Sequence, residues 1–167
     1  IRDRETADIA IRSALTGHFV YSTLHTNDAP SAVTRLIDIG VKPFLVASST
    51  RCLMAQRLVR KICTECRRAY TPEPAELIEV GIDPKKVQGH QFYKGMGCET
   101  CRRTGYKGRI GLFELIMSTP ELREMIARRA TLGEINQYVI QKQGMRTMLQ
   151  DGQAKILSGQ TTSREVF

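Results

Sequence analysis

Two Cys-x-x-Cys pairs constrain this chain more than any other feature of its sequence. They are Cys63 with Cys66 and Cys98 with Cys101, and 31 residues (67–97) separate them. Two thiolates on one tight turn can reach the same ion, and two such turns complete a tetrahedral zinc site with Zn–S distances of about 2.3 Å. No signal peptide is recognised, so paired cysteines indicate metal binding in a reducing cytoplasm before they indicate disulfides. We predict one structural zinc; fortuitous cysteines or a redox pair are the alternatives.

The surroundings of the cysteines support the metal interpretation. Two arginines follow each pair directly, and their charge is expected to offset the roughly −2 charge of a Zn(Cys)4 centre. These arginines are Arg67, Arg68, Arg102 and Arg103. Four protein ligands close the site, so a catalytic zinc is not expected. The fifth cysteine, Cys52, is predicted to be a buried apolar residue in a helix.

The N-terminal part of the chain has an α/β pattern. Apolar residues at helical spacing predict a helix over residues 7–15 and another over residues 29–37, with Asp28 as its N-cap. The β-branched and aromatic run at 18–24 predicts a strand between them. This alternation favours a layered α/β core with a parallel sheet.

The later segments define the predicted domain organisation. A long helix is expected after Pro43, running to about Ile62, and a strand over residues 111–116. The segment between the two cysteine pairs is interrupted by glycines and prolines. It has room for a helix at 74–80 and a strand at 90–93. The end of the chain is predicted to be helical, with Thr119-Pro120 as cap and first residue, a helix over 145–157, and capping boxes at Thr131/Glu134 and Thr162/Glu165. We therefore divide the chain into a core part (1–62), a four-cysteine module (63–108) and a strand with a helical subdomain (109–167).

The charge of the chain leaves several classes of partner open. Its net charge is +8 at pH 7 with a pI of about 9.5. Such basicity fits nucleic acid, an anionic membrane surface or bound phosphate. A zinc-ribbon module that binds nucleic acid is the main alternative function, although the module has few aromatic residues to stack on bases. No apolar run approaches the ~18 residues of a membrane span.

One histidine is a candidate site residue. His25 follows the predicted strand 18–24, and ligands of open α/β sheets bind beyond the carboxyl ends of strands. His25 is therefore either a sensor of a terminal phosphate or a turn residue that caps the next helix. The sequence contains no Gly-x4-Gly-Lys-[Ser/Thr] phosphate loop.

Five blocks of the sequence resemble the type II/type IV secretion ATPase family. Residues 1–7 (IRDRETA) look like the stretch that follows the Walker B glutamate, and 16–27 (TGHFVYSTLHTN) resemble the family's His box. Residues 55–66 and 105–115 resemble the entry to and exit from its zinc module, and 144–162 its C-terminal tail. The blocks are distributed along the chain from residue 1 to about residue 166, in family order. One departure is Tyr21, where the family often has a small aliphatic residue.

The resemblance implies a fold, an activity and site residues. It implies the C-terminal part of a RecA-like ATPase core, in a homo-hexamer that drives type II secretion or type IV pilus assembly from the cytoplasmic side of the inner membrane. The zinc module points to the assembly branch. His25 would lie against the terminal phosphate of ATP, Arg109 would face the active site or subunit interface, and Arg2 would lie beside the catalytic glutamate.

The resemblance also implies cofactors and partners. Zn2+ would be structural, whereas ATP and Mg2+ would bind the full-length protein. An inner-membrane platform protein and cytoplasmic docking proteins would be the partners, and no specific nucleic acid is expected. Because the phosphate loop and the catalytic glutamate would lie upstream of Ile1, residues 1–167 alone are expected to be inactive.

Overall fold

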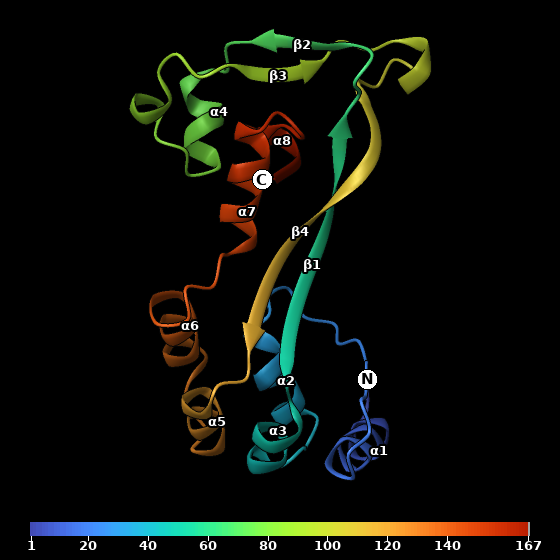
Figure 1. The fold of residues 1–167 in the computed structure, drawn as a ribbon, viewed down its shortest axis with the longest axis vertical. Helices are drawn as coiled ribbons and strands as arrows, with labels where there is room; N and C mark the ends of the chain where they lie inside the picture. The colour runs from blue at the N-terminus through green and yellow to red at the C-terminus, as the bar shows by residue number, and fades with distance from the viewer. Residues whose placement is uncertain (167) are drawn as a thin grey trace. The chain divides into compact units, whose positions relative to one another are not determined.

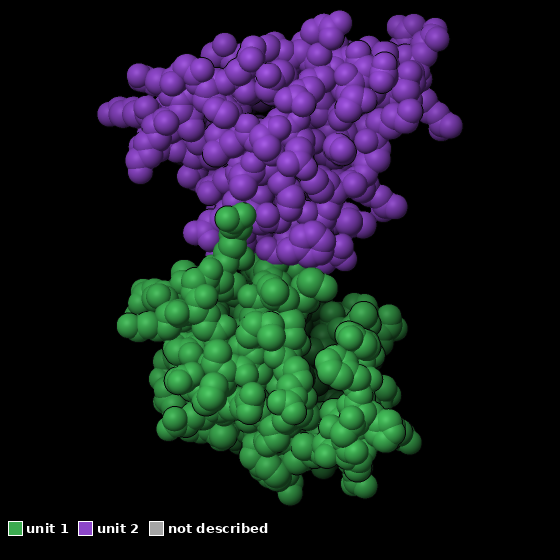
Figure 2. Space-filling view, in the orientation of Figure 1, with its two compact units in different colours: residues 1–55, 114–146 green, residues 56–113, 147–167 purple. Residues whose placement is uncertain are grey.

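The computed structural model describes residues 1–166, which form two compact units. Unit 1 consists of residues 1–55 and 114–146, and unit 2 of residues 56–113 and those from Thr147 onward (Figure 2). Two strands, β1 (Cys52–Ile62) and β4 (Tyr106–Met117), contribute residues to both units. They pair with each other and run in opposite directions (Figure 1). The chain is thus a mixed α/β protein.

Unit 1 is mainly helical. Its helices are α1 (Arg4–Leu15), α2 (Ser31–Asp38), α3 (Pro43–Ser49), α5 (Pro120–Ala127) and α6 (Leu132–Gln141). Aliphatic side chains form its core, among them Ile11, Val33, Val46, Ile116, Leu122, Ile126 and Val139. The predicted cap Thr119 before Pro120 and the predicted capping box Thr131/Glu134 are confirmed. These caps satisfy backbone N–H groups of the first turns, which is why both helices begin where the sequence predicts.

Unit 2 is built around a two-stranded antiparallel sheet. Strands β2 (Arg67–Tyr70) and β3 (Phe92–Gly95) pair so that Arg67 lies opposite Gly95 and Tyr70 opposite Phe92. Helices α4 (Pro74–Glu79), α7 (Met148–Leu157) and α8 (Ser163–Val166), with the 3-10 turns η1 (Pro84–Val87) and η2 (Glu99–Cys101), complete the unit. Its apolar core contains Val59, Leu77, Val80, Ile82, Phe92, Leu112, Ile156 and Val166.

Several side-chain contacts fasten the end of the chain to the strands of unit 2. The Asp151 carboxylate accepts a hydrogen bond from the Phe113 backbone N–H at 3.0 Å and pairs with Lys155, whose Nζ donates to the Gly111 carbonyl at 2.8 Å. Glu165 pairs with Arg60 at 2.6 Å. Hydrogen bonds from Arg60 lower the pKa of Glu165. The predicted capping box Thr162/Glu165 is therefore wrong, because the Glu165 carboxylate binds Arg60 instead.

The predicted long helix from Pro43 to Ile62 is also wrong. Helix α3 ends at Ser49, and residues 52–62 form strand β1. Residues 52–62 contain many helix formers, but pairing with β4 overrides that local preference. Cys52 consequently lies at the start of a strand, where it is exposed rather than buried in a helix.

The predicted strand over 18–24 is absent within residues 1–166. These residues have no regular secondary structure, and Phe19 and Tyr21 are 80% and 86% exposed. A strand exists only when its backbone pairs with a neighbour, and none of the described residues offers a ladder to this segment. The parallel sheet expected there is accordingly not formed by the described residues, whose two sheets each have two strands.

Other predicted elements are confirmed with small shifts. The predicted helices over 7–15, 29–37, 74–80 and 145–157 are found as α1, α2, α4 and α7. The predicted strand 111–116 lies within the longer β4, and the strand expected at 90–93 begins two residues later as β3. None of the helices described is long and apolar enough to span a membrane. The functional division into 1–62, 63–108 and 109–167 stays a prediction.

Candidate functional site

The four predicted metal ligands come together in unit 2. The sulfur atoms of Cys63, Cys66, Cys98 and Cys101 all lie within 4.8 Å of one another. The Sγ–Sγ distances are 3.8 Å for Cys63–Cys98, 3.8 Å for Cys66–Cys101 and 3.7 Å for Cys98–Cys101. A tetrahedron with Zn–S bonds of about 2.3 Å has edges of about 3.8 Å, whereas a disulfide needs about 2.0 Å. The spacing therefore fits four ligands of one metal ion and not two disulfides.

Backbone geometry sets this spacing. Gly105 has φ +80°, and a Cβ on it would lie 2.5 Å from the Gly95 carbonyl oxygen. Only glycine combines that conformation with so close an approach of two chain segments. The Cys63 N–H donates to the Gly105 carbonyl at 2.9 Å, which joins the end of β1 to the second cysteine turn. The turn itself places Arg102 and Arg103 in left-handed conformations directly after Cys101.

Backbone N–H groups point at the sulfurs. Cys66 Sγ accepts a hydrogen bond from Gly97 at 3.2 Å, and Cys101 Sγ accepts from Cys98 at 3.1 Å and Gly105 at 3.3 Å. The Cys98 N–H lowers the pKa of Cys101 to about 6, whereas burial raises the pKa of Cys66 to about 11. A divalent cation bound at this position would favour the thiolate form of its cysteine ligands.

The arginines after the cysteines do not bind the sulfurs directly. The Arg67 guanidinium stacks on the Tyr93 ring, with Cζ 3.6 Å from the ring centroid, and Arg68 donates to the Arg67 carbonyl. Within residues 1–166, none of the four guanidinium groups donates a hydrogen bond to a cysteine sulfur. Their role in offsetting the charge of the metal centre stays a prediction.

Unit 1 brings Arg2 and His25 together. Arg2 Nε donates to His25 Nε2 at 3.0 Å, and the Ile1 amino nitrogen donates to the Thr23 carbonyl at 2.6 Å. Since a neutral imidazole that accepts at Nε2 carries its hydrogen on Nδ1, His25 keeps one N–H donor. Both side chains are exposed. The pair can therefore offer a positive guanidinium and a ring N–H to an anion.

His25 is not a cap of the following helix. The Asp28 carboxylate accepts from the Ser31 N–H at 2.8 Å, and the buried Glu114 accepts from the Ala29 N–H at 3.0 Å. These two carboxylates satisfy the turn that precedes α2, so the capping alternative for His25 is wrong. The sequence pattern assigned no role to Glu114, although the alternation of the strand could have indicated that it is buried. Every second residue of this part of β4 faces the core, and Leu112, Glu114 and Ile116 are all buried.

The third predicted site residue, Arg109, lies in unit 2. It is an exposed residue of β4, just after Gly108, which has φ +79°. Among residues 1–166 its side chain has no hydrogen-bond or ion-pair partner. The structure thus joins Arg2 to His25 and leaves Arg109 in the other unit.

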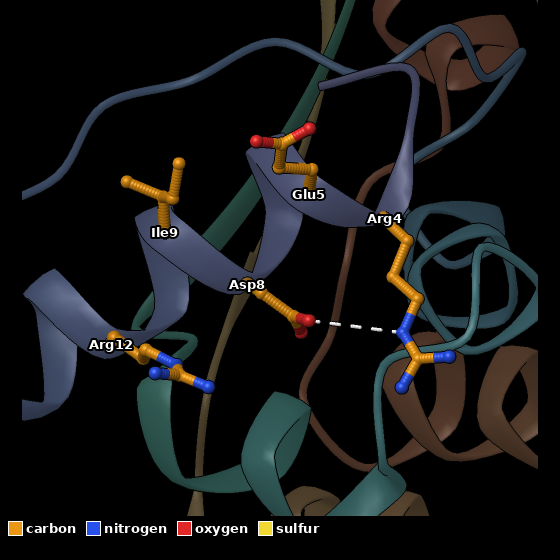
Figure 3. A pocket seen from close by; sticks show the side chains of 5 residues that line it. All are labelled: Arg4, Glu5, Asp8, Ile9 and Arg12. Atoms are coloured by element: carbon orange, nitrogen blue, oxygen red, sulfur yellow. Dashed lines mark ion pairs between the residues drawn. The ribbon is translucent and has the colours of Figure 1, made fainter.

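Two surface depressions contain none of these residues. One, of about 470 Å³, lies along α1, where Arg4 and Asp8 form an ion pair at 3.7 Å (Figure 3). Figure 3 shows Glu5 and Ile9 pointing away from that pair, so the Glu5 carboxylate does not join it. The other, of about 660 Å³, is in unit 2 and has Tyr70 and Phe92 in its wall.

Comparison with known proteins shows the family of the chain. The family model "Type II/IV secretion system protein" matches residues 1–167. The chain belongs to this family. It is 45% identical over its whole length to the type IV pilus assembly ATPase PilB of Thermus thermophilus, covering 19% of that protein. It is 41% identical to the type II secretion system protein E of Pseudomonas aeruginosa, again over its whole length and 32% of that protein.

Two solved structures share the fold. The chain matches the pilus retraction motor PilT with a TM-score of 0.64 and 21% identity, covering 100% of the chain and 36% of PilT. It matches the Legionella pneumophila ATPase DotB with a TM-score of 0.62 and 21% identity, covering 99% of the chain and 35% of DotB. The resemblance seen in the sequence is thus confirmed, and the chain spans about a fifth to a third of the relatives it matches.

Proposed function

We propose that this chain forms part of a hexameric ATPase that drives type II secretion or type IV pilus assembly. Family membership supports the class of activity, since the relatives named above are an ATPase and a secretion protein of this kind. The observation that carries the site is the hydrogen bond between Arg2 and His25. The comparisons give no support to a nucleic-acid-binding zinc ribbon.

The Arg2–His25 pair would bind the terminal phosphate of ATP in the complete protein. A guanidinium suits phosphate because it stays charged and donates from a planar fork. Arg2 Nε is occupied by His25, so the terminal guanidinium nitrogens and the His25 Nδ1–H remain to donate. Donors fixed before the reaction stabilise the charge that develops on a transferring phosphoryl group. ATP and Mg2+ would be held largely by residues outside this chain.

Arg109 is proposed to act on the same chemistry from a position at the nucleotide or the subunit interface. Its exposed side chain on β4 is available to a ligand or to another subunit. An arginine that acts as a finger on the transition state can contribute about 10³–10⁵ in rate.

Residues 63–108 would form a structural zinc module. The fit rests on the tetrahedral sulfur spacing and on the three N–H···S hydrogen bonds. Bound Zn2+ would cross-link the two cysteine turns, and with four protein ligands it would have no open position for a substrate. We propose that the protein works on the cytoplasmic side of the inner membrane, through the platform and docking proteins of the machine.

The test is mutagenesis in the complete ATPase. His25→Ala, Arg2→Ala and Arg109→Ala should each lower kcat by about tenfold or more, with the melting temperature and zinc content unchanged. His18→Ala and Lys107→Ala are the matched controls, because both residues are exposed and close in sequence to the tested positions.

Two outcomes would contradict the assignment. If a variant keeps turnover within about twofold of the parent, the replaced residue is not part of the site. If its turnover falls only as far as its melting temperature falls, the residue has a structural role. Residues 1–167 alone should show no ATP turnover above a mock purification, because they contain no phosphate loop.

A further inference from the structure

A buried carboxylate in unit 1 has a place in the fold that packing alone does not explain. Glu114 is 6% exposed, and it is the only Asp, Glu, Lys or Arg that is buried among residues 1–166. Its neighbours on the same face of β4, Leu112 and Ile116, are each 1% exposed. Burial of a carboxylate is unfavourable unless hydrogen bonds replace its water. An apolar side chain would therefore suit this position better if it served the core alone.

The hydrogen bond from Ala29 shows what the carboxylate holds. Glu114 Oε2 accepts from the Ala29 N–H at 3.0 Å, across 85 residues of sequence. Ala29 and Pro30 are buried, and they end the loop that begins at His25. A charge-assisted bond to a backbone N–H is stronger than a neutral one, and burial protects it from competing water. The far end of the His25 loop is thus fixed to a strand.

The loop has a second, local anchor. Asp28 accepts from the Ser31 N–H at 2.8 Å, which shapes the turn into α2 but reaches only three residues along the chain. At its other end, the loop is held by the Arg2–His25 hydrogen bond. Glu114 is therefore the anchor that ties the loop to β4.

We propose that Glu114 is a positioning residue for His25, and this inference rests on the proposed binding of the ATP terminal phosphate by His25. Glu114 does not touch the nucleotide. It fixes the backbone at Ala29, four residues beyond His25, so that the imidazole keeps one placement. A reacting group held less firmly loses rate through misplacement even when substrate still binds. Loss of the anchor should therefore affect the response to the terminal phosphate and spare binding of the rest of the nucleotide.

The experiment uses two replacements of Glu114 in the complete ATPase. Glu114→Gln keeps an acceptor oxygen at the same distance, and Glu114→Met keeps the length without an acceptor. We expect Glu114→Met to lower kcat by about tenfold and to weaken binding of a non-hydrolysable ATP analogue, with ADP affinity within about twofold of the parent. Glu114→Gln should recover most of the activity. Glu124→Met, an exposed position on α5, is the matched control.

A double-mutant cycle separates this inference from the proposed function. If Glu114 acts through His25, then His25→Ala with Glu114→Met should lose no more activity than His25→Ala alone. If His25→Ala is itself without effect, the proposed role of His25 fails. If His25→Ala matters but the two losses multiply, or if Glu114→Met weakens ADP and the ATP analogue equally, the positioning inference fails. It also fails if neither Glu114 variant folds, because Glu114 would then serve the core of unit 1.

Discussion

The two candidate sites are built in different ways. In unit 2, all four metal ligands and the N–H groups that support them come from this chain, and glycine geometry sets their spacing. In unit 1, the Arg2–His25 pair is exposed and rests on a few side-chain bonds to a loop. The four proposed metal ligands are therefore all found within residues 1–166, whereas the Arg2–His25 pair is proposed to act on a nucleotide that residues outside this chain would largely hold.

The strongest way to break this comparison is to remove the metal. Cys101→Ser should abolish zinc binding and unfold much of unit 2, because a structural zinc contributes on the order of 10 kcal/mol to a small module. Unit 1 should keep its protection, since its core is aliphatic and contains no cysteine ligand. Elemental analysis and hydrogen exchange resolved by residue would measure both effects. Cys52→Ser is the control, and a zinc-free parent that is fully folded would contradict the prediction.

A glycine replacement tests whether backbone geometry builds the metal centre. Gly105→Ala should destabilise unit 2 by about 2 kcal/mol or more, because the left-handed conformation alone costs about 1–2 kcal/mol and the new Cβ would meet the Gly95 carbonyl. In unit 1, Gly133→Ala meets only the Thr131 hydroxyl at 3.9 Å and should stabilise α6 by about 0.5–1 kcal/mol. Chemical denaturation with zinc present would compare them. If the two replacements change the free energy of unfolding equally, Gly105 is not needed for the close approach of the chain segments at Gly95 and Gly105.

Matched cap removals sharpen the comparison between the two units. Thr131 caps α6 in unit 1, and Thr147 caps α7 in unit 2, each through a capping box. Replacement of either by Ala should cost about 1 kcal/mol. Hydrogen exchange should report the loss in unit 1 for Thr131→Ala and in unit 2 for Thr147→Ala. A loss spread evenly over both units in each variant would show that they do not unfold separately.

The smallest expected effect is a pH dependence in unit 1. The Thr131 backbone N–H lowers the pKa of Glu134 below its usual value of about 4.3. The folded state therefore favours the charged form of Glu134. Its contribution to the free energy of unfolding is fully present above a pH of about 4.3, the usual pKa, and is lost as the pH falls through the lowered pKa. The difference in melting temperature between the parent and Glu134→Gln should shrink on acidification toward pH 3. If the difference in melting temperature does not change with pH, the stabilisation by Glu134 comes from hydrogen bonding and not from its charge.

Residue chemistry predicted some of these features well. Cysteine spacing located the four-cysteine cluster, and the Thr119 and Thr131 caps located two helices, because these signals act within a few residues. The segment 52–62 was wrongly assigned to a helix, because its state depends on pairing with β4, more than 40 residues later. The strand over 18–24 failed for the same reason, since β propensity has no effect without a partner. Glu114 was missed because its role depends on Ala29, 85 residues away.

The arrangement of the cysteines means that a bound metal ion would act as a cross-link between distant parts of the chain. Cys66 and Cys101 are 35 positions apart in the chain, and closing a loop of that size removes about 4 kcal/mol of conformational freedom from the unfolded chain. The entropic cost of closing the loop grows only with the logarithm of its length, by about 0.6 kcal/mol for each doubling. Lengthening the exposed turn near Gly89 should therefore be tolerated. Moving one cysteine by a single position should not be tolerated. Metal binding requires each sulfur to lie at a fixed distance from the ion, whereas the entropy of loop closure changes little with loop length.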